Sequence, residues 1–285
     1  MSESSTLLPP GRPGGSDPVV AAAGDIACDP ADVGYNGGAG ATFVCMMPAT
    51  ARLLDQIHPD VVMALGDLQY ENGTAAAFAA SYDKTWGRWK AKTRPAVGNH
   101  EFQTKGATGY FAYWGAAAGA PGKGWYSYDV GTWHVVVLNA NCGIVGCGAG
   151  SEQEQWLRAD LAAHPAVCTL AYWHQPRYSS GLHGDDPATE AFWVDLAAAH
   201  ADLVLDGHDH DYERFAPQRG IRQFTVGTGG RSLYLFRATP DPGSEVRNAT
   251  TFGVLQLTLH PTGYDWRFVG VPGSSFTDSG TGDCS

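Results

Sequence analysis

The stretch Leu203–His210 has the sequence LVLDGHDH, and it decides the predicted fold of this chain. A short apolar run, which predicts a buried strand, is followed by a glycine and then by His208 and His210, separated by a single residue. Glycine allows the sharp turn that brings such side chains back over the end of a strand. If other strands end in the same way, their polar residues and these two imidazoles can share one edge of a sheet.

Four further segments show the same succession of an apolar strand and a polar loop. In chain order they are Val19–Asp25, Val61–Tyr70, Pro95–Glu101 and Thr169–His174. In α/β sheets, ligands bind outside the carboxyl ends of the strands. The five loops together therefore predict one site, built from seven side chains: Asp25, Asp67, Tyr70, Asn99, His174, His208 and His210.

The kinds of donor in this set indicate transition-metal ions. The set mixes carboxylate, phenol, amide and imidazole groups, whereas calcium prefers oxygen ligands and one ion rarely holds so many mixed donors. Two first-row transition ions fit better, with one carboxylate bridging them. Two ions about 3.5–4 Å apart can hold a phosphate and a hydroxide together, which favours an in-line displacement at phosphorus.

The rest of the pattern predicts a single layered α/β domain over residues 19–285, because strands alternate with helices before a strand-rich end. The predicted helices are Thr50–Ile57, Ala75–Trp89, Ser151–His164 and Asp186–His200. Strands are also expected in a hairpin over Trp125–Leu138 and at Arg222–Val226, Ser232–Phe236, Phe252–Leu259 and Tyr264–Val269. Residues 1–18 are rich in Ser, Pro and Gly, so we expect a disordered N-terminal tail there.

Composition argues against several classes of partner. The 285-residue chain has 29 acidic and 18 basic residues and a net charge of −11, which disfavours nucleic acid as its main ligand. It has no apolar run of about 18 residues, so no membrane-spanning helix is expected. A chain of this length can bury a sizeable core by itself, and we expect a monomer.

Six cysteines bear on the compartment. Sequence alone leaves 15 pairings open, and six reduced thiols in a cytosolic protein are the alternative. Cys142–Cys147 and Cys28–Cys45 bracket Gly-rich loops, and Cys168–Cys284 would tie down the C-terminus. Because disulfides persist in oxidising compartments, these pairs predict a secreted or periplasmic protein, although residues 1–18 do not resemble a secretory signal.

The five loops, in this order, resemble those of the metallophosphoesterase superfamily, and within it the purple acid phosphatase-like branch, which has the calcineurin-like phosphoesterase fold. The general superfamily has Asp-x-His in its first motif, but the position of that histidine is Ala27 here. Purple acid phosphatases also lack it and supply a tyrosine from a Gly-Asp-x-x-Tyr motif, which Gly66–Tyr70 matches. A phenolate is a hard donor that favours a trivalent ion, so Fe(III) becomes the expected occupant.

The resemblance implies a fold and a set of ligands. The fold is a four-layer α/β/β/α sandwich of two mixed sheets flanked by helices, with the metal site at the carboxyl ends of strands. Fe(III) is expected at Asp25, Asp67, Tyr70 and His210, and a divalent Fe, Zn or Mn ion at Asp67, Asn99, His174 and His208. His100 and His183 are the expected catalytic and substrate-binding residues, and Arg177 is a weaker candidate for anion binding. Glu101 is expected to orient its loop, and Asp209 to face away from the site.

The implied activity is hydrolysis of small phosphate monoesters by a metal-activated hydroxide, as in acid phosphatases. Three alternatives remain open: a phosphodiesterase using the same site, a non-catalytic metal-dependent phosphate-binding module, and redox chemistry at a di-iron centre. A chromogenic phosphate monoester separates the phosphatase from the binding module.

Overall fold

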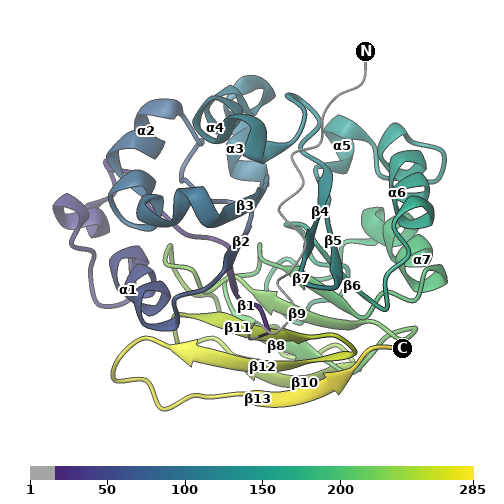
Figure 1. Cartoon of the computed structure of the whole chain (residues 1–285). Helices are drawn as coiled ribbons and strands as arrows, with labels where there is room; N and C mark the ends of the chain where they lie inside the picture. The colour runs from purple at the N-terminus through teal and green to yellow at the C-terminus, as the bar shows by residue number, and fades with distance from the viewer. Residues whose placement is uncertain (1–16) are drawn as a thin grey trace.

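The structure, a computed structural model, describes residues 17–285 and contains two β-sheets between two groups of helices (Figure 1). The six-stranded sheet has the order β13-β12-β11-β1-β2-β3, and the seven-stranded sheet has the order β10-β8-β9-β7-β6-β5-β4. Helices α1 to α4 lie beside the first sheet, and α5 to α7 beside the second (Figure 1). The predicted four-layer sandwich is confirmed.

The strands are β1 Val19–Ala23, β2 Val61–Leu65, β3 Thr93–Ala96, β4 Tyr126–Val130, β5 Trp133–Val137, β6 Cys168–Tyr172, β7 Leu203–Asp206, β8 Tyr212–Phe215, β9 Arg222–Val226, β10 Ser244–Asn248, β11 Gly253–His260, β12 Gly263–Gly270 and β13 Ser279–Asp283. The α-helices are α1 Met47–Ile57, α2 Ala75–Ala80, α3 Asn99–Gln103, α4 Thr108–Trp114, α5 Cys142–Val145, α6 Glu152–Ala163 and α7 Glu190–Ala198. Short 3-10 helices cover Val33–Gly38, Tyr82–Lys84, Trp86–Lys92, Lys105–Ala107, Gly115–Ala118 and Pro187–Thr189. None of the helices in residues 17–285 is long and apolar enough to cross a membrane.

The central strands of the seven-stranded sheet, β5, β6 and β7, are buried on both faces. On β5, Val135 and Val137 belong to the core shared with the first sheet, whereas Val136 belongs to a second core. That second core includes Leu157 of α6 and Trp193 of α7. Alternate side chains of a strand point to opposite faces, so a strand buried on both faces is mostly apolar. On β5 the one polar residue is His134, which is paired with Asp129 and Asp160.

Parallel pairing brings the predicted loops to a common edge. In the first sheet β1, β2 and β3 are parallel, and in the second β5, β6, β7 and β9 are parallel. The two sheets are joined just past these strand ends, where the Gly24 N–H donates to the carbonyl of Val226 at 2.9 Å. The loops that follow β1, β2, β3, β6 and β7 therefore emerge on the same side of the molecule.

Two predicted elements are wrong. The helix predicted over Ala75–Trp89 is α2 followed by two 3-10 helices, because its aromatic residues pack in different directions: Phe78 stacks on Tyr113 of α4, while the indole of Trp86 donates to Thr50 of α1. The strand predicted at Ser232–Phe236 is an irregular segment.

All three predicted disulfides are present, with Cα–Cα distances of 5.4 Å for Cys28–Cys45, 5.0 Å for Cys142–Cys147 and 5.4 Å for Cys168–Cys284. The predicted N-terminal tail lies outside the described residues except for Asp17 and Pro18. Both of these contact β11: Asp17 pairs with His260 at 2.6 Å, and the Pro18 carbonyl accepts the N–H of Leu259.

Candidate metal centre

The loop after β2 brings Tyr70 against Asp25, which follows β1. The Tyr70 hydroxyl donates to Asp25 Oδ1 at 2.7 Å and lies 3.2 Å from Asp67 Oδ2. His210, from the loop after β7, places Nε2 2.9 Å from the same hydroxyl and 3.2 Å from Asp25 Oδ1. The four side chains expected to bind Fe(III) therefore form one buried group.

A second group meets the first at Asp67. His174 Nε2 lies 3.0 Å from Asp67 Oδ2, and His208 Nδ1 lies 3.3 Å from His174 Nε2. Ligand atoms of Asp67, His174 and His208 all lie within 4.8 Å of one another, as in a metal site. Asn99 begins α3, and the next residue fixes that turn, since the His100 N–H donates to Asp67 Oδ1 at 2.8 Å.

The donors suit a pair of cations. Asn99 Oδ1 is buried and finds no hydrogen-bond partner within residues 17–285, although buried polar atoms are normally paired. Two of the imidazole rings are oriented by a contact at Nδ1, which leaves Nε2 toward the other predicted ligands. His174 Nδ1 contacts the carbonyl of Leu65 at 2.8 Å, and His210 Nδ1 contacts Ser232 Oγ at 2.9 Å. Such outer contacts are typical of metal-binding histidines.

Glycines make room for these side chains. A Cβ at Gly66 would lie 2.6 Å from the His174 ring, one at Gly98 2.1 Å from Asp67 Oδ1, and one at Gly207 2.6 Å from Asp25 Oδ2. Two of the acidic residues also have left-handed backbones, with φ of 59° at Asp25 and 47° at Asp67. A non-glycine residue there costs about 1–3 kcal/mol, and such strain is concentrated at functional sites.

Burial and neighbouring charges shift the pKa values of three predicted ligands. Burial acts against ionisation, but the Asp67 carboxylate outweighs it and raises the pKa of His174 to about 10. Burial and the neighbouring His174 charge lower the pKa of His208 to about 4. Burial, followed by the charges of Asp25 and Asp67, raises the pKa of the Tyr70 phenol. Metal binding at these residues must therefore release protons from His174 and Tyr70.

The two expected catalytic histidines flank the ligands. The His100 ring lies 4.3 Å from the Tyr70 ring between centroids, and the His183 ring lies 4.2 Å from that of His208. Arg177 lies elsewhere: its Nε pairs with Glu190 at 2.7 Å and its guanidinium covers Tyr178, so none of its described contacts is with a predicted ligand.

The side chain of Asp209 has no described contact with a predicted metal ligand, but it contacts His183, which the sequence did not indicate. It is fully buried, and its Oδ1 lies 2.9 Å from His183 Nδ1 and also accepts the His183 N–H. The hydrogen bond with Asp209 raises the pKa of His183. The strand prediction for residues 232–236 also gave no indication that Tyr234 belongs to the site. Its ring stacks on the His210 ring, with centroids 4.0 Å apart.

Glu101 orients its loop, as expected, and does so with both oxygens. Its Oε1 accepts the N–H groups of Leu68 and Gln69, and its Oε2 accepts those of Asp67 and Gly98. Burial and the nearby Asp67 charge act to raise the pKa of Glu101, while the four backbone donors act in the opposite direction and favour the carboxylate form. Glu101 therefore ties the β2 loop, which carries two ligands, to the β3 loop.

Comparisons with known proteins agree with this geometry. The family model for calcineurin-like phosphoesterases matches residues 20–212. Arabidopsis thaliana purple acid phosphatase 15 is 27% identical over 68% of this chain and 44% of its own length. Arabidopsis purple acid phosphatase 21 is 30% identical over 74% of this chain and 54% of its own. The chain thus spans about half the length of these curated relatives.

Solved structures show the same fold. Purple acid phosphatase PPD1 from yellow lupin seeds has a TM-score of 0.74, covering 95% of this chain and 54% of that chain at 23% identity. GAP50, described as the anchor in the inner membrane complex of Plasmodium, has a TM-score of 0.71, covering 95% of this chain and 90% of that chain at 12% identity. The matched family model, the relatives and the ligand geometry together place this chain in the calcineurin-like phosphoesterase family, in its purple acid phosphatase-like branch.

Proposed function

We propose that this protein is a metal-dependent phosphatase that hydrolyses small phosphate monoesters at a dinuclear centre. Fe(III) would be held by Asp25, Asp67, Tyr70 and His210, and a divalent Fe, Zn or Mn ion by Asp67, Asn99, His174 and His208. One observation carries the proposal: Asp67 Oδ2 lies 3.2 Å from the Tyr70 hydroxyl and 3.0 Å from His174 Nε2, so Asp67 lies where the two groups meet. The three disulfides support a secreted or periplasmic location.

When bound, the two ions would supply a nucleophilic hydroxide from water and neutralise charge on the phosphate. The chain's own residues then handle the proton and the substrate. His183 is half-exposed beside His208, and Asp209 fixes its Nδ1, so Nε2 is free to give a proton to the leaving oxygen. His100 Nδ1 lies 2.6 Å from the carbonyl of Glu71, which leaves its Nε2 for a phosphate oxygen.

The first test combines three measurements on the purified protein: its metal content, its absorption spectrum and its turnover of a chromogenic phosphate monoester. We expect two metal ions per chain, a tyrosinate-to-iron band giving a purple or pink colour, and turnover that is lost on chelation and regained with iron plus a divalent metal. Turnover of a diester alone would indicate a phosphodiesterase. A fully metallated protein without turnover of either ester would indicate a binding module, as fold likeness does not fix activity.

Asp209→Asn is expected to shift the basic limb of the kcat/KM profile to lower pH by about one unit. The Asp209 contact raises the pKa of His183, so the protonated donor persists to higher pH; removing the negative charge lowers that pKa and ends activity earlier. Asp186→Asn is the control, because Asp186 caps the next helix by accepting the N–H of Ala188. An unmoved basic limb in Asp209→Asn would remove His183 from the proton-donor role.

A further inference from the structure

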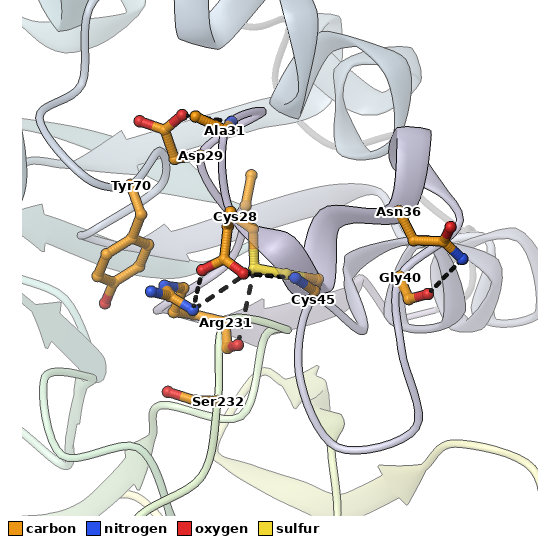
Figure 2. The surroundings of a disulfide bond; sticks show 12 residues. Cys28, Asp29, Ala31, Asn36, Gly40, Cys45, Tyr70, Arg231 and Ser232 are labelled. Atoms are coloured by element: carbon orange, nitrogen blue, oxygen red, sulfur yellow. Dashed lines mark hydrogen bonds and ion pairs between the residues drawn. A yellow bond between two sulfur atoms is a disulfide. The ribbon is translucent and has the colours of Figure 1, made fainter.

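A fixed positive charge lies against the predicted tyrosine ligand. The guanidinium carbon of Arg231 is 5.3 Å from the centroid of the Tyr70 ring, and the Arg231 side chain is largely buried. Figure 2 shows this side chain between Tyr70 and the disulfide Cys28–Cys45. A guanidinium placed over an aromatic ring is attracted to its face, and the attraction is stronger where water is excluded.

Two carboxylates from different segments hold the guanidinium. Its Nη2 lies 2.6 Å from Glu71, which directly follows Tyr70, and its Nη1 lies 3.0 Å from Asp32. Asp32 belongs to the segment between the two cysteines, where it caps a 3-10 helix by accepting the N–H of Gly34 at 2.7 Å. Arg231 therefore links the ligand loop after β2 to the disulfide-closed segment.

The backbone of Arg231 is held by the same segment. The N–H of Cys45 donates to the Arg231 carbonyl at 3.1 Å, and the N–H of Met46 donates to the carbonyl of Gly230 at 2.7 Å. On its other side, the Arg231 N–H donates to the carbonyl of Asp25, a predicted ligand, at 2.9 Å. Both cysteines are fully buried. The disulfide thus fixes the segment that places Arg231.

We propose that Arg231 is a positioning residue for Tyr70, and that the segment closed by Cys28–Cys45 holds it there through Asp32 and through the Cys45 N–H. This inference rests on the proposed function. Arg231 contacts the ring of Tyr70, while Asp25 and His210 contact its hydroxyl. A nearby positive charge also stabilises electrons on a phenolate, so it raises the energy needed to transfer one of them to Fe(III).

The test compares the wild type with Arg231→Met, Arg231→Lys, Asp32→Asn and the double variant Cys28→Ala/Cys45→Ala. In the metal-loaded protein, Arg231→Met should move the tyrosinate-to-iron band to longer wavelength and lower kcat/KM about 10- to 100-fold. Arg231→Lys keeps a positive charge but cannot bridge two carboxylates in the same way, so its band should lie between those of the wild type and Arg231→Met. Asp32→Asn breaks one link with the disulfide intact, which covers the case in which the double variant does not fold.

Cys168→Ala/Cys284→Ala is the matched control. This disulfide begins β6, at the opposite edge of the sheet from the ligands, and it closes a separation of 116 residues against 17 for Cys28–Cys45. A longer loop contributes more stability, so the control is expected to be the less stable double variant. It should nevertheless leave the band unchanged, which separates positioning from general destabilisation.

A second readout needs no metal. In the metal-free protein, amide hydrogen exchange at positions 45, 46 and 231 should be faster in Cys28→Ala/Cys45→Ala and in Asp32→Asn, and unchanged in the control. A loaded Arg231→Met protein with the wild-type band and kcat/KM would overturn the proposal. If the loaded wild type is colourless, the ferric–tyrosinate centre is refuted, and wild-type exchange in both segment variants would then refute the positioning role as well.

Discussion

Asp67→Ala is expected to lower phosphatase turnover by roughly 10³-fold or more and to remove most of the bound metal. Loss of one stabilising donor from a catalytic site already costs about 10²–10³-fold, and this substitution takes a ligand from both proposed ions. It also leaves His174 without its carboxylate partner and the His100 N–H without its acceptor. Metal content by elemental analysis and turnover of a chromogenic monoester are the measurements.

Asp67→Asn separates charge from shape. An amide retains an oxygen for the His100 N–H but makes a poor bridge between cations, so metal and turnover should again be lost. Asp160→Asn is the matched control: Asp160 is also a buried carboxylate paired with a histidine, His134, at 2.9 Å, but it lies on α6. A metallated, active Asp67→Ala protein would contradict the bridging role.

The ligand loops could be predicted because their chemistry is local. In each case an apolar run is followed within one to five residues by the donor, and parallel pairing alone brings such positions to one edge. The apolar parts of the predicted segments Val19–Asp25 and Val61–Tyr70 form β1 and β2, because strands buried on both faces are mostly apolar.

The contacts around the ligands could not be predicted, since they join residues far apart in the chain. Nothing near Arg231 in sequence indicates that Asp32 and Glu71 hold its guanidinium, and Asp209 reads as a spacer between two histidines. The segment Ser232–Phe236 has the composition of a strand, yet Ser232 and Tyr234 instead contact His210. Tertiary contacts override local propensity in such segments.

Glu101→Ala is expected to lower the free energy of unfolding of the metal-free protein by about 3–5 kcal/mol. Four backbone N–H groups would lose their acceptor, and a buried unsatisfied donor costs about 1–3 kcal/mol, part of which water entering the space can recover. For a chain of this size the loss corresponds to a drop in Tm of roughly 10 °C. Urea denaturation and thermal scans measure it.

Glu101→Gln tests whether both oxygens are needed. The amide keeps the size of the side chain but offers one acceptor oxygen, so two of the N–H donors would face an NH₂ group. We expect a smaller loss of stability than in Glu101→Ala, together with metal binding weakened about 10- to 100-fold, because the β2 and β3 loops carry Asp67, Tyr70 and Asn99.

Glu154→Ala is the matched control for this pair, because Glu154 is also a buried glutamate but accepts a single loop N–H, that of Gly150 at 2.8 Å. If the two alanine variants lose equal stability, the four N–H bonds to Glu101 add nothing beyond ordinary burial. If Glu101→Ala loses more stability yet binds two metal ions with wild-type affinity, the loops keep their ligand geometry without Glu101. Only a loss of both stability and metal affinity agrees with a Glu101 carboxylate that positions the ligand loops in the metal-free protein.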